Sequence, residues 1–173
     1  ISNTYGPSVL PNGKGVLLTV IRGANVASIA VMDLRTRKRR LLADGIRAIY
    51  ASPGRLLYVT SDRTLYAAPF DEARMEITGP GEPVGQNLWS PFRGWADLAV
   101  SPSGTLLHLN ATGASVSGNE FVIVDRQGKE KLLPIPPARY DAFGLSPDGR
   151  RVAAEVLSGS DDGGAIVIFG LGD

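Results

Sequence analysis

The stretch that decides the fold is Ser146-Pro147-Asp148-Gly149, because three other segments repeat its plan. These segments are Leu10-Pro11-Asn12-Gly13, Ser52-Pro53-Gly54 and Ser101-Pro102-Ser103-Gly104. Each follows a short apolar block and precedes a longer one, and the successive prolines lie 42, 49 and 45 residues apart. Proline presets one corner of a turn, and glycine tolerates the positive φ of a tight hairpin. A period of about 40 to 50 residues with several strands in each unit predicts the blades of a β-propeller.

Short apolar blocks rich in β-branched residues recur between these turns, bounded by Gly, Pro, Asn, Asp or Ser, as is typical of strands joined by hairpins. The blocks are Val16–Val20, Ile29–Met32, Leu56–Thr60, Leu65–Ala68, Leu98–Val100, Leu106–Leu109, Phe121–Val124, Val152–Val156 and Ala165–Phe169. Gly and Pro, 21 and 12 of the 173 residues, leave little room for helices. The one stretch of helical composition, Asp71 to Glu76, is expected to be a loop. The sequence therefore predicts an all-β protein.

The repeats divide the chain into four antiparallel blades, at approximately residues 4–45, 46–94, 95–138 and 139–173. Three blades are expected to have four strands, the fourth strand being short and peripheral, and the last blade lacks its outer strand. We expect a β-propeller arc that is either a fragment of a six- to eight-bladed ring or a half-ring completed by a second copy. Open edges of this kind invite association, so a homodimer is a possible partner state.

Composition excludes several kinds of site. The formal net charge of +1 argues against a molecule built as a whole to bind polyanions such as nucleic acids. Absence of Cys excludes disulfides, thiolate zinc sites and Cys nucleophiles, and the single His108 cannot form a His-rich metal site. We expect no metal and no cofactor. No apolar run approaches the ~20 residues that span a bilayer, and a chain that begins at Ile1 is expected to be a processed or excised piece.

Residues Ser146 to Ala153 resemble the signature of the TolB-like, WD40-like (PD40) bacterial propeller repeats. Leu65–Asp71 running on to Gly79, followed by Phe121–Gly128, resembles the propeller at the C-terminus of many bacterial serine/threonine protein kinases. The resemblance implies a non-catalytic sensor or interaction domain, often in an extracytoplasmic (periplasmic or cell-surface) position. The sequence departs from the pattern at Ser103, where the repeat usually has Asp, and in the shortened turn Ser52-Pro53-Gly54.

Several motifs can be interpreted either as functional sites or as ordinary structural elements. Gly113–Gly118 nearly matches a nucleophile elbow, but Ser117 replaces the second Gly, so a loop is favoured. His108 is interpreted as a strand residue that faces a neighbouring blade. Asp161-Asp162-Gly163-Gly164 lacks the alternate spacing of a calcium loop and is read as a turn. The basic run Arg35 to Arg40 could hold phosphates, but a solvated hairpin explains it equally well.

Propeller geometry predicts a binding surface where the loops entering the innermost strands open onto one face. The residues expected there are Tyr5, Arg47, Trp95, Tyr140 and Asp141, together with Trp89 and Phe92. Exposed aromatic side chains with an Arg and an Asp are common anchors of binding sites. The alternative is that Trp95 and Tyr140 pack between blades.

Three functions remain open at this point. The leading one is an interaction module without enzymatic activity that binds a protein or peptide. The second is part of the propeller that gates a serine peptidase of the prolyl-oligopeptidase type, which uses similar repeats. The third is a structural arc whose activity is self-association.

Overall fold

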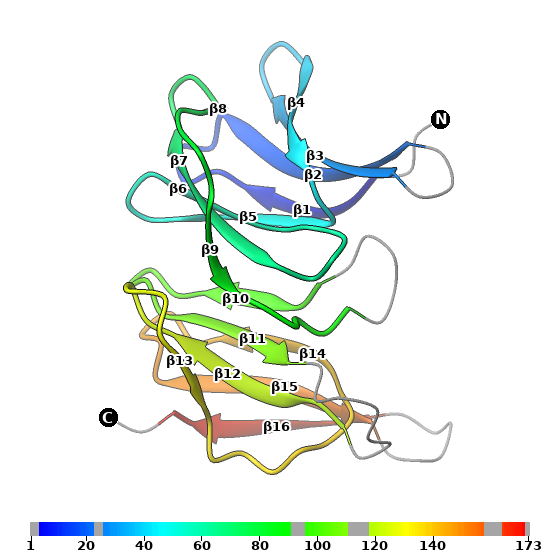
Figure 1. Cartoon of the computed structure of the whole chain (residues 1–173), viewed down its shortest axis with the longest axis vertical. Coiled ribbons are helices and arrows are strands. Elements are labelled where there is room, and N and C mark those ends of the chain that lie inside the picture. Colours follow the sequence, from blue (N-terminus) through cyan, green and yellow to red (C-terminus); the bar gives the residue numbers. More distant parts are fainter. Residues whose placement is uncertain (1–3, 23–25, 91–95, 111–117, 158–163, 172–173) are drawn as a thin grey trace. The chain divides into compact units, whose positions relative to one another are not determined.

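The computed structural model describes residues 4–22, 26–90, 96–110, 118–157 and 164–171, and all regular structure in these ranges is β-strand (Figure 1). The strands form four antiparallel sheets, which confirms the predicted all-β fold of propeller blades. The nine apolar blocks lie in strands, except that Thr60 follows the end of its strand at Val59. Among the described residues, no helix is long and apolar enough to cross a membrane.

Each of the sheets follows the order of the sequence. The first contains β1 (Thr4–Val9), β2 (Gly15–Arg22), β3 (Val26–Asp33) and β4 (Arg39–Asp44). The second contains β5 (Arg47–Ala51), β6 (Arg55–Val59), β7 (Leu65–Asp71), β8 (Glu76–Ile77) and β9 (Glu82–Gly85). The third contains β10 (Leu98–Val100), β11 (Leu106–Asn110), β12 (Glu120–Val124) and β13 (Glu130–Leu132). The fourth contains β14 (Tyr140–Leu145), β15 (Arg151–Leu157) and β16 (Gly164–Gly170) and has no fourth strand in the described residues.

The sheets belong to two compact units, the first made of Ile1–Gln86 with Ser90–Ala96 and the second of Asn87–Trp89 with Asp97–Asp173. Each unit has a hydrophobic core between its two sheets. In the first unit, Leu17 and Ile29 of the first sheet pack with Leu56 of the second. In the second unit, Phe121 of the third sheet packs with Val152 of the fourth. Burial of these faces supplies the main driving force for stacking one sheet on the next.

The turn glycines adopt the conformation that their spacing predicts. Gly13, Gly54, Gly104 and Gly149 have φ of 68°, 61°, 88° and 70°. Three of them also donate their N–H back across the turn, as Gly149 does to the carbonyl of Ser146 at 2.8 Å. An L side chain rarely adopts a positive φ, so the repeated glycine follows from the repeated hairpin.

Ser103 takes the place of the usual Asp without loss of the turn. In the fourth sheet, the Ser146 hydroxyl donates to Asp148 and accepts the N–H of Arg151 at 3.0 Å. In the third sheet, the Ser101 and Ser103 hydroxyls lie 2.8 Å apart, and Ser101 Oγ accepts the N–H of Thr105 at 3.0 Å. The departure from the repeat pattern therefore keeps the side-chain bond that closes the turn.

The outer strand of the second sheet is broken into two pieces. Both β8 and β9 pair with β7, β8 at Phe70 and Asp71 and β9 from Leu65 to Ala67. The expected loop from Asp71 to Glu76 is a tight turn between β7 and β8, with Met75 at φ 56°. The chain then returns along the same edge of β7, so that β8 and β9 together replace one peripheral strand.

Candidate functional site

Tyr5 and Arg47 are brought close together at the first strands of two adjacent sheets. Tyr5 lies on β1 opposite Thr19 and is 42% exposed. Arg47 begins β5, is half-buried, and directs its guanidinium against the backbone of Gly6. Gly6 has φ of 56°, and a Cβ at this position would collide with Arg47 Nη1. The positive φ favours glycine here, and the absence of a side chain leaves room for the guanidinium of Arg47.

Tyr140 has a structural position in the second unit. Its side chain is 4% exposed, and its ring centroid lies 4.6 Å from that of Phe121 on β12 and 6.2 Å from that of Phe169 on β16. The hydroxyl donates to the carbonyl of Pro136 at 2.7 Å, and burial raises the pKa of Tyr140. The ring therefore packs between two sheets, which is the alternative that the sequence left open.

The remaining residues of the predicted surface lie in different places. Asp141 follows Tyr140 on β14 and is exposed, whereas Trp89 is half-buried and packs against the core of the second unit. Phe92 and Trp95 lie outside the described residues, as do Ser117 and the pair Asp161 and Asp162. Tyr5 and Arg47 belong to the other unit, so one common face for all seven residues stays a prediction.

His108 is a fully buried strand residue on β11, opposite Leu98 and Val122. Its Nδ1 lies 3.2 Å from the carbonyl of Leu109, so Nδ1 carries the proton of the neutral ring. Nε2 lies 3.8 Å from Glu130 Oε1, beyond hydrogen-bond distance. Burial lowers the pKa of His108 despite this carboxylate, so the ring is neutral at pH 7. Among the described residues, no cluster of three or more His, Asp or Glu is placed to hold a metal ion.

The basic run Arg35 to Arg40 forms the turn between β3 and β4 and the start of β4. Asp33 accepts the N–H groups of Arg35 and Thr36 at 2.8 and 2.7 Å, which closes the turn. Arg40 donates to the carbonyls of Arg74 and Met75 in the turn between β7 and β8. One cation of the run therefore anchors a peripheral strand to the neighbouring sheet, and the others are exposed.

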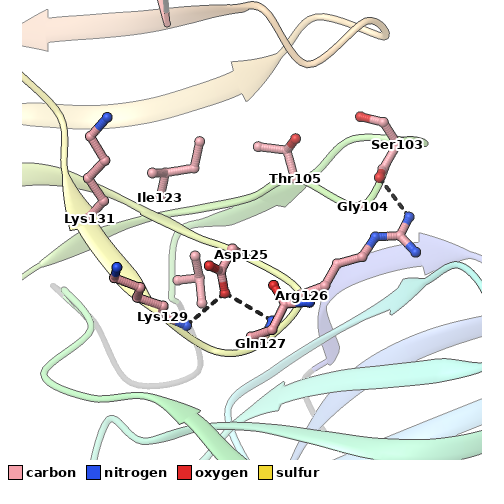
Figure 2. A pocket seen from close by; sticks show the side chains of 10 residues that line it. Ser103, Gly104, Thr105, Ile123, Asp125, Arg126, Gln127, Lys129 and Lys131 are labelled. Atoms are coloured by element: carbon pink, nitrogen blue, oxygen red, sulfur yellow. Dashed lines mark hydrogen bonds between the residues drawn. The ribbon is translucent and has the colours of Figure 1, made fainter. Parts of the chain in front are cut away.

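A further pocket was not predicted from the sequence. Figure 2 shows that it lies between the turn joining β10 to β11 and the turn joining β12 to β13, with a volume of about 500 Å³. It is lined by Ser103, Gly104, Thr105, Ile123, Val124, Asp125, Arg126, Gln127, Lys129 and Lys131. The two turns are about twenty residues apart in the sequence, and nothing in the repeat indicates that Arg126 closes over Gly104. The only signal was three cations close together around a hairpin, which reads equally well as a solvated turn.

Comparisons with known proteins support the fold. No family model matches the sequence, and no curated protein matches it. Among solved structures, TolB from Acinetobacter baumannii matches with a TM-score of 0.71 and 16% identity over 98% of this chain and 41% of TolB. A puromycin-hydrolysing peptidase of Mycobacterium tuberculosis matches with a TM-score of 0.73 and 11% identity over 98% of this chain and 27% of the peptidase. The β-propeller domain of Cps50 (Swd1) from Myceliophteria thermophila matches with a TM-score of 0.62 and 18% identity over 90% and 51% of the two chains.

These likenesses confirm the β-propeller fold that the sequence predicted, and TolB structures are among them. The chain spans about half or less of each of these three structures, as a fragment of a larger propeller does. The resemblance to kinase propellers stays a prediction. The similar structures include enzymes as well as propeller domains, so the fold alone assigns no activity.

Proposed function

We propose that this chain is a propeller interaction module that binds a protein or peptide and has no catalytic activity of its own. The observation that carries the proposal is the pair Tyr5 and Arg47. Tyr5 is exposed, and the guanidinium of Arg47 lies against the backbone of Gly6, the next residue in the chain. Tyr and Arg are the side chains that most often dominate binding energy, and a cation held in place loses less entropy when it binds.

The test is selection of binding peptides from a random phage-displayed library on the folded chain, followed by affinity measurements with variants. Tyr5→Ala is expected to lower the affinity of the chain for the selected peptides by about tenfold or more, because the substitution removes the exposed ring. Leu41→Ala is the matched control, because Leu41 is similarly exposed at 47% in the same sheet. Selected peptides that bind wild type and Tyr5→Ala equally well would place the interaction elsewhere.

A second candidate is part of the propeller of a serine peptidase, because a puromycin-hydrolysing peptidase is among the similar structures. Reading the source gene beyond the codon for Asp173 separates the two functions. An α/β-hydrolase domain downstream supports the peptidase, and a kinase domain upstream supports the interaction module of a kinase. The extracytoplasmic location implied by the family resemblance is part of the first proposal, and a reporter-enzyme fusion to the complete gene product tests it.

A further inference from the structure

The pocket between the turns of the third sheet carries an excess of positive charge. Arg126, Lys129 and Lys131 line it, and no ion pair to a carboxylate is found for any of them within the described ranges. The one carboxylate of the lining, Asp125, accepts the N–H groups of Gln127 and Lys129, both at 2.9 Å. Its role is therefore to close the turn, and the lining has a formal charge of +2 in a chain whose total is +1.

Arg126 reaches from its own turn to the turn between β10 and β11. Its guanidinium lies flat over Gly104, where a Cβ would come within 2.8 Å of Nη2 and 3.1 Å of Cζ. Nη2 also donates to the carbonyl of Ser103 at 2.8 Å, which uses one of the five N–H donors of the guanidinium. This arrangement, drawn in Figure 2, places a cation at one end of the pocket, with N–H donors left for an anion.

The turn between β14 and β15 adds further positive charge nearby. A Cβ on Gly149 would lie 3.1 Å from Ser101 Oγ and 3.2 Å from Ser103 Oγ, so this turn packs against the lining of the pocket. The turn presents Arg150, and Arg151 follows it; both are exposed. Asp148 accepts the Ser146 hydroxyl and the N–H of Arg150 at 3.0 Å, and these bonds lower its pKa.

The spacing of the two lysines selects the form of the ligand. Lys129 and Lys131 are two residues apart on one side of an extended chain, so their Cα atoms are separated by about 7 Å. Carboxylates on alternate residues of an extended peptide have the same spacing, so each lysine can meet one of them. Ile123 adds an apolar side chain to the lining, next to Lys131 in Figure 2.

The edge of β13 offers main-chain bonds to the same peptide. The carbonyl of Lys129 accepts the N–H of Asp125, the residue after β12, at 3.1 Å, and the N–H of Leu133 donates to the carbonyl of Phe121 on β12 at 2.9 Å. Because antiparallel strands alternate the direction of their backbone groups, Lys131 also faces β12 and the N–H and C=O of Leu132 point away from it. Addition of an extended peptide to an open sheet edge is a common mode of recognition.

We propose that this pocket and the edge of β13 bind an extended peptide with acidic side chains at alternate positions. The site is separate from Tyr5 and Arg47 and goes beyond the function proposed above. Carboxylates of the peptide bind Lys129, Lys131 and Arg126, and its backbone pairs with Leu132. Because the lysines are exposed, added salt weakens the complex.

The test is fluorescence anisotropy of the whole chain with a labelled peptide in which every second residue is glutamate. Lys129→Gln combined with Lys131→Gln is expected to weaken binding by about tenfold or more. Arg35→Gln combined with Lys38→Gln is the matched control, because both residues are exposed cations on another hairpin, and it should change affinity by less than about twofold. The same peptide with glutamine in place of glutamate should not bind.

Three results would overturn the proposal. The first is absence of binding to the glutamate peptide, and the second is an equal loss in the control pair, which would mean diffuse charge attraction. The third is complete displacement of the peptide by millimolar phosphate but not by chloride at the same ionic strength, which would mean a site for a single anion. Tyr5→Ala should leave binding of this peptide unchanged, so failure here and failure of the proposed function are distinguishable.

Discussion

Gly149 shows how a single turn residue meets two constraints at once. Its φ of 70° disfavours any L side chain, and the space for a Cβ is bounded by Ser101 and Ser103 in the turn of the preceding sheet. The same residue therefore shapes its own hairpin and allows two hairpins to approach. The repeat in the sequence indicated the first constraint, but the second depends on the packing of two sheets.

Gly149→Ala is expected to lower the free energy of unfolding by about 1–2 kcal/mol, the cost of a left-handed L residue. Urea unfolding followed by circular dichroism measures this loss. Gly144→Ala is the control, because Gly144 lies on β14 without a positive φ and a Cβ there meets nothing within 4 Å. It should change stability by less than about 0.5 kcal/mol. Equal losses in both variants would mean that glycine is not required by the turn.

His108 makes stability depend on pH in a defined window. Burial holds the pKa of His108 in the folded chain below the ordinary value of 6.5. In the pH range between the two pKa values, the imidazole is therefore protonated in the unfolded chain and neutral in the folded chain. Stability is therefore complete above pH 6.5 and falls as the pH drops from 6.5 toward the folded pKa. His108 is the only histidine. Hydrogen bonds lower the pKa values of Asp33, Asp62 and Asp148 below 3.8, which keeps them out of this window.

Denaturant unfolding at several pH values between about 7 and 5.5 tests this dependence. The free energy of unfolding of the wild type is expected to fall as the pH drops across this range. For His108→Gln, the free energy of unfolding should change less with pH, whatever its absolute value. The slope is the informative quantity, because removal of a buried ring also costs packing energy. An unchanged slope in the variant would show that His108 does not titrate differently on folding.

At the scale of elements, the strands could be predicted because their apolar blocks are punctuated by turn residues. The block Val152 to Val156 lies between Gly149 and the Gly-rich segment before β16, and it forms the centre of β15. The broken outer strand of the second sheet could not be predicted in this way. Glu76-Ile77 and Glu82–Gly85 are short and partly polar, and only pairing with β7 makes them strands.

The candidate sites were less predictable than the strands, since they depend on distances between hairpins. A tyrosine at the start of a strand, such as Tyr140, can have either an exposed or a packed side chain. The ring of Tyr140 is packed because the rings of Phe121 and Phe169 lie against it. Arg47 was expected on the binding surface, but its contact with Gly6 depends on the approach of β1 to β5. Gly104 was recognised as a turn glycine, whereas its second role as the platform for Arg126 could not be read from the repeat.

At the scale of the whole molecule, exposed apolar side chains are distributed unevenly. Of eight exposed large hydrophobic residues in the described part of the chain, five lie in the first sheet or its last turn and two lie on β16. The peripheral strand of the first sheet, β4, carries the charged residues Arg39 and Arg40. Such charge protects an open edge from pairing with another chain. The fourth sheet ends instead in β16, whose sequence from Gly164 to Gly170 has no charged residue.

This unprotected edge predicts self-association of the chain in solution. Ile166 and Ile168 on β16 are 78% and 65% exposed, and β16 pairs only with β15 among the described residues. Size-exclusion chromatography with light scattering should show a mass that rises with concentration. Ile166→Lys combined with Ile168→Lys is expected to raise the dissociation constant by about tenfold or more, because pairing would bury two charges. Leu132→Lys, a comparably exposed residue on the charged strand β13, should have no such effect. A wild-type mass equal to one chain at every concentration would mean that β16 is not an association edge.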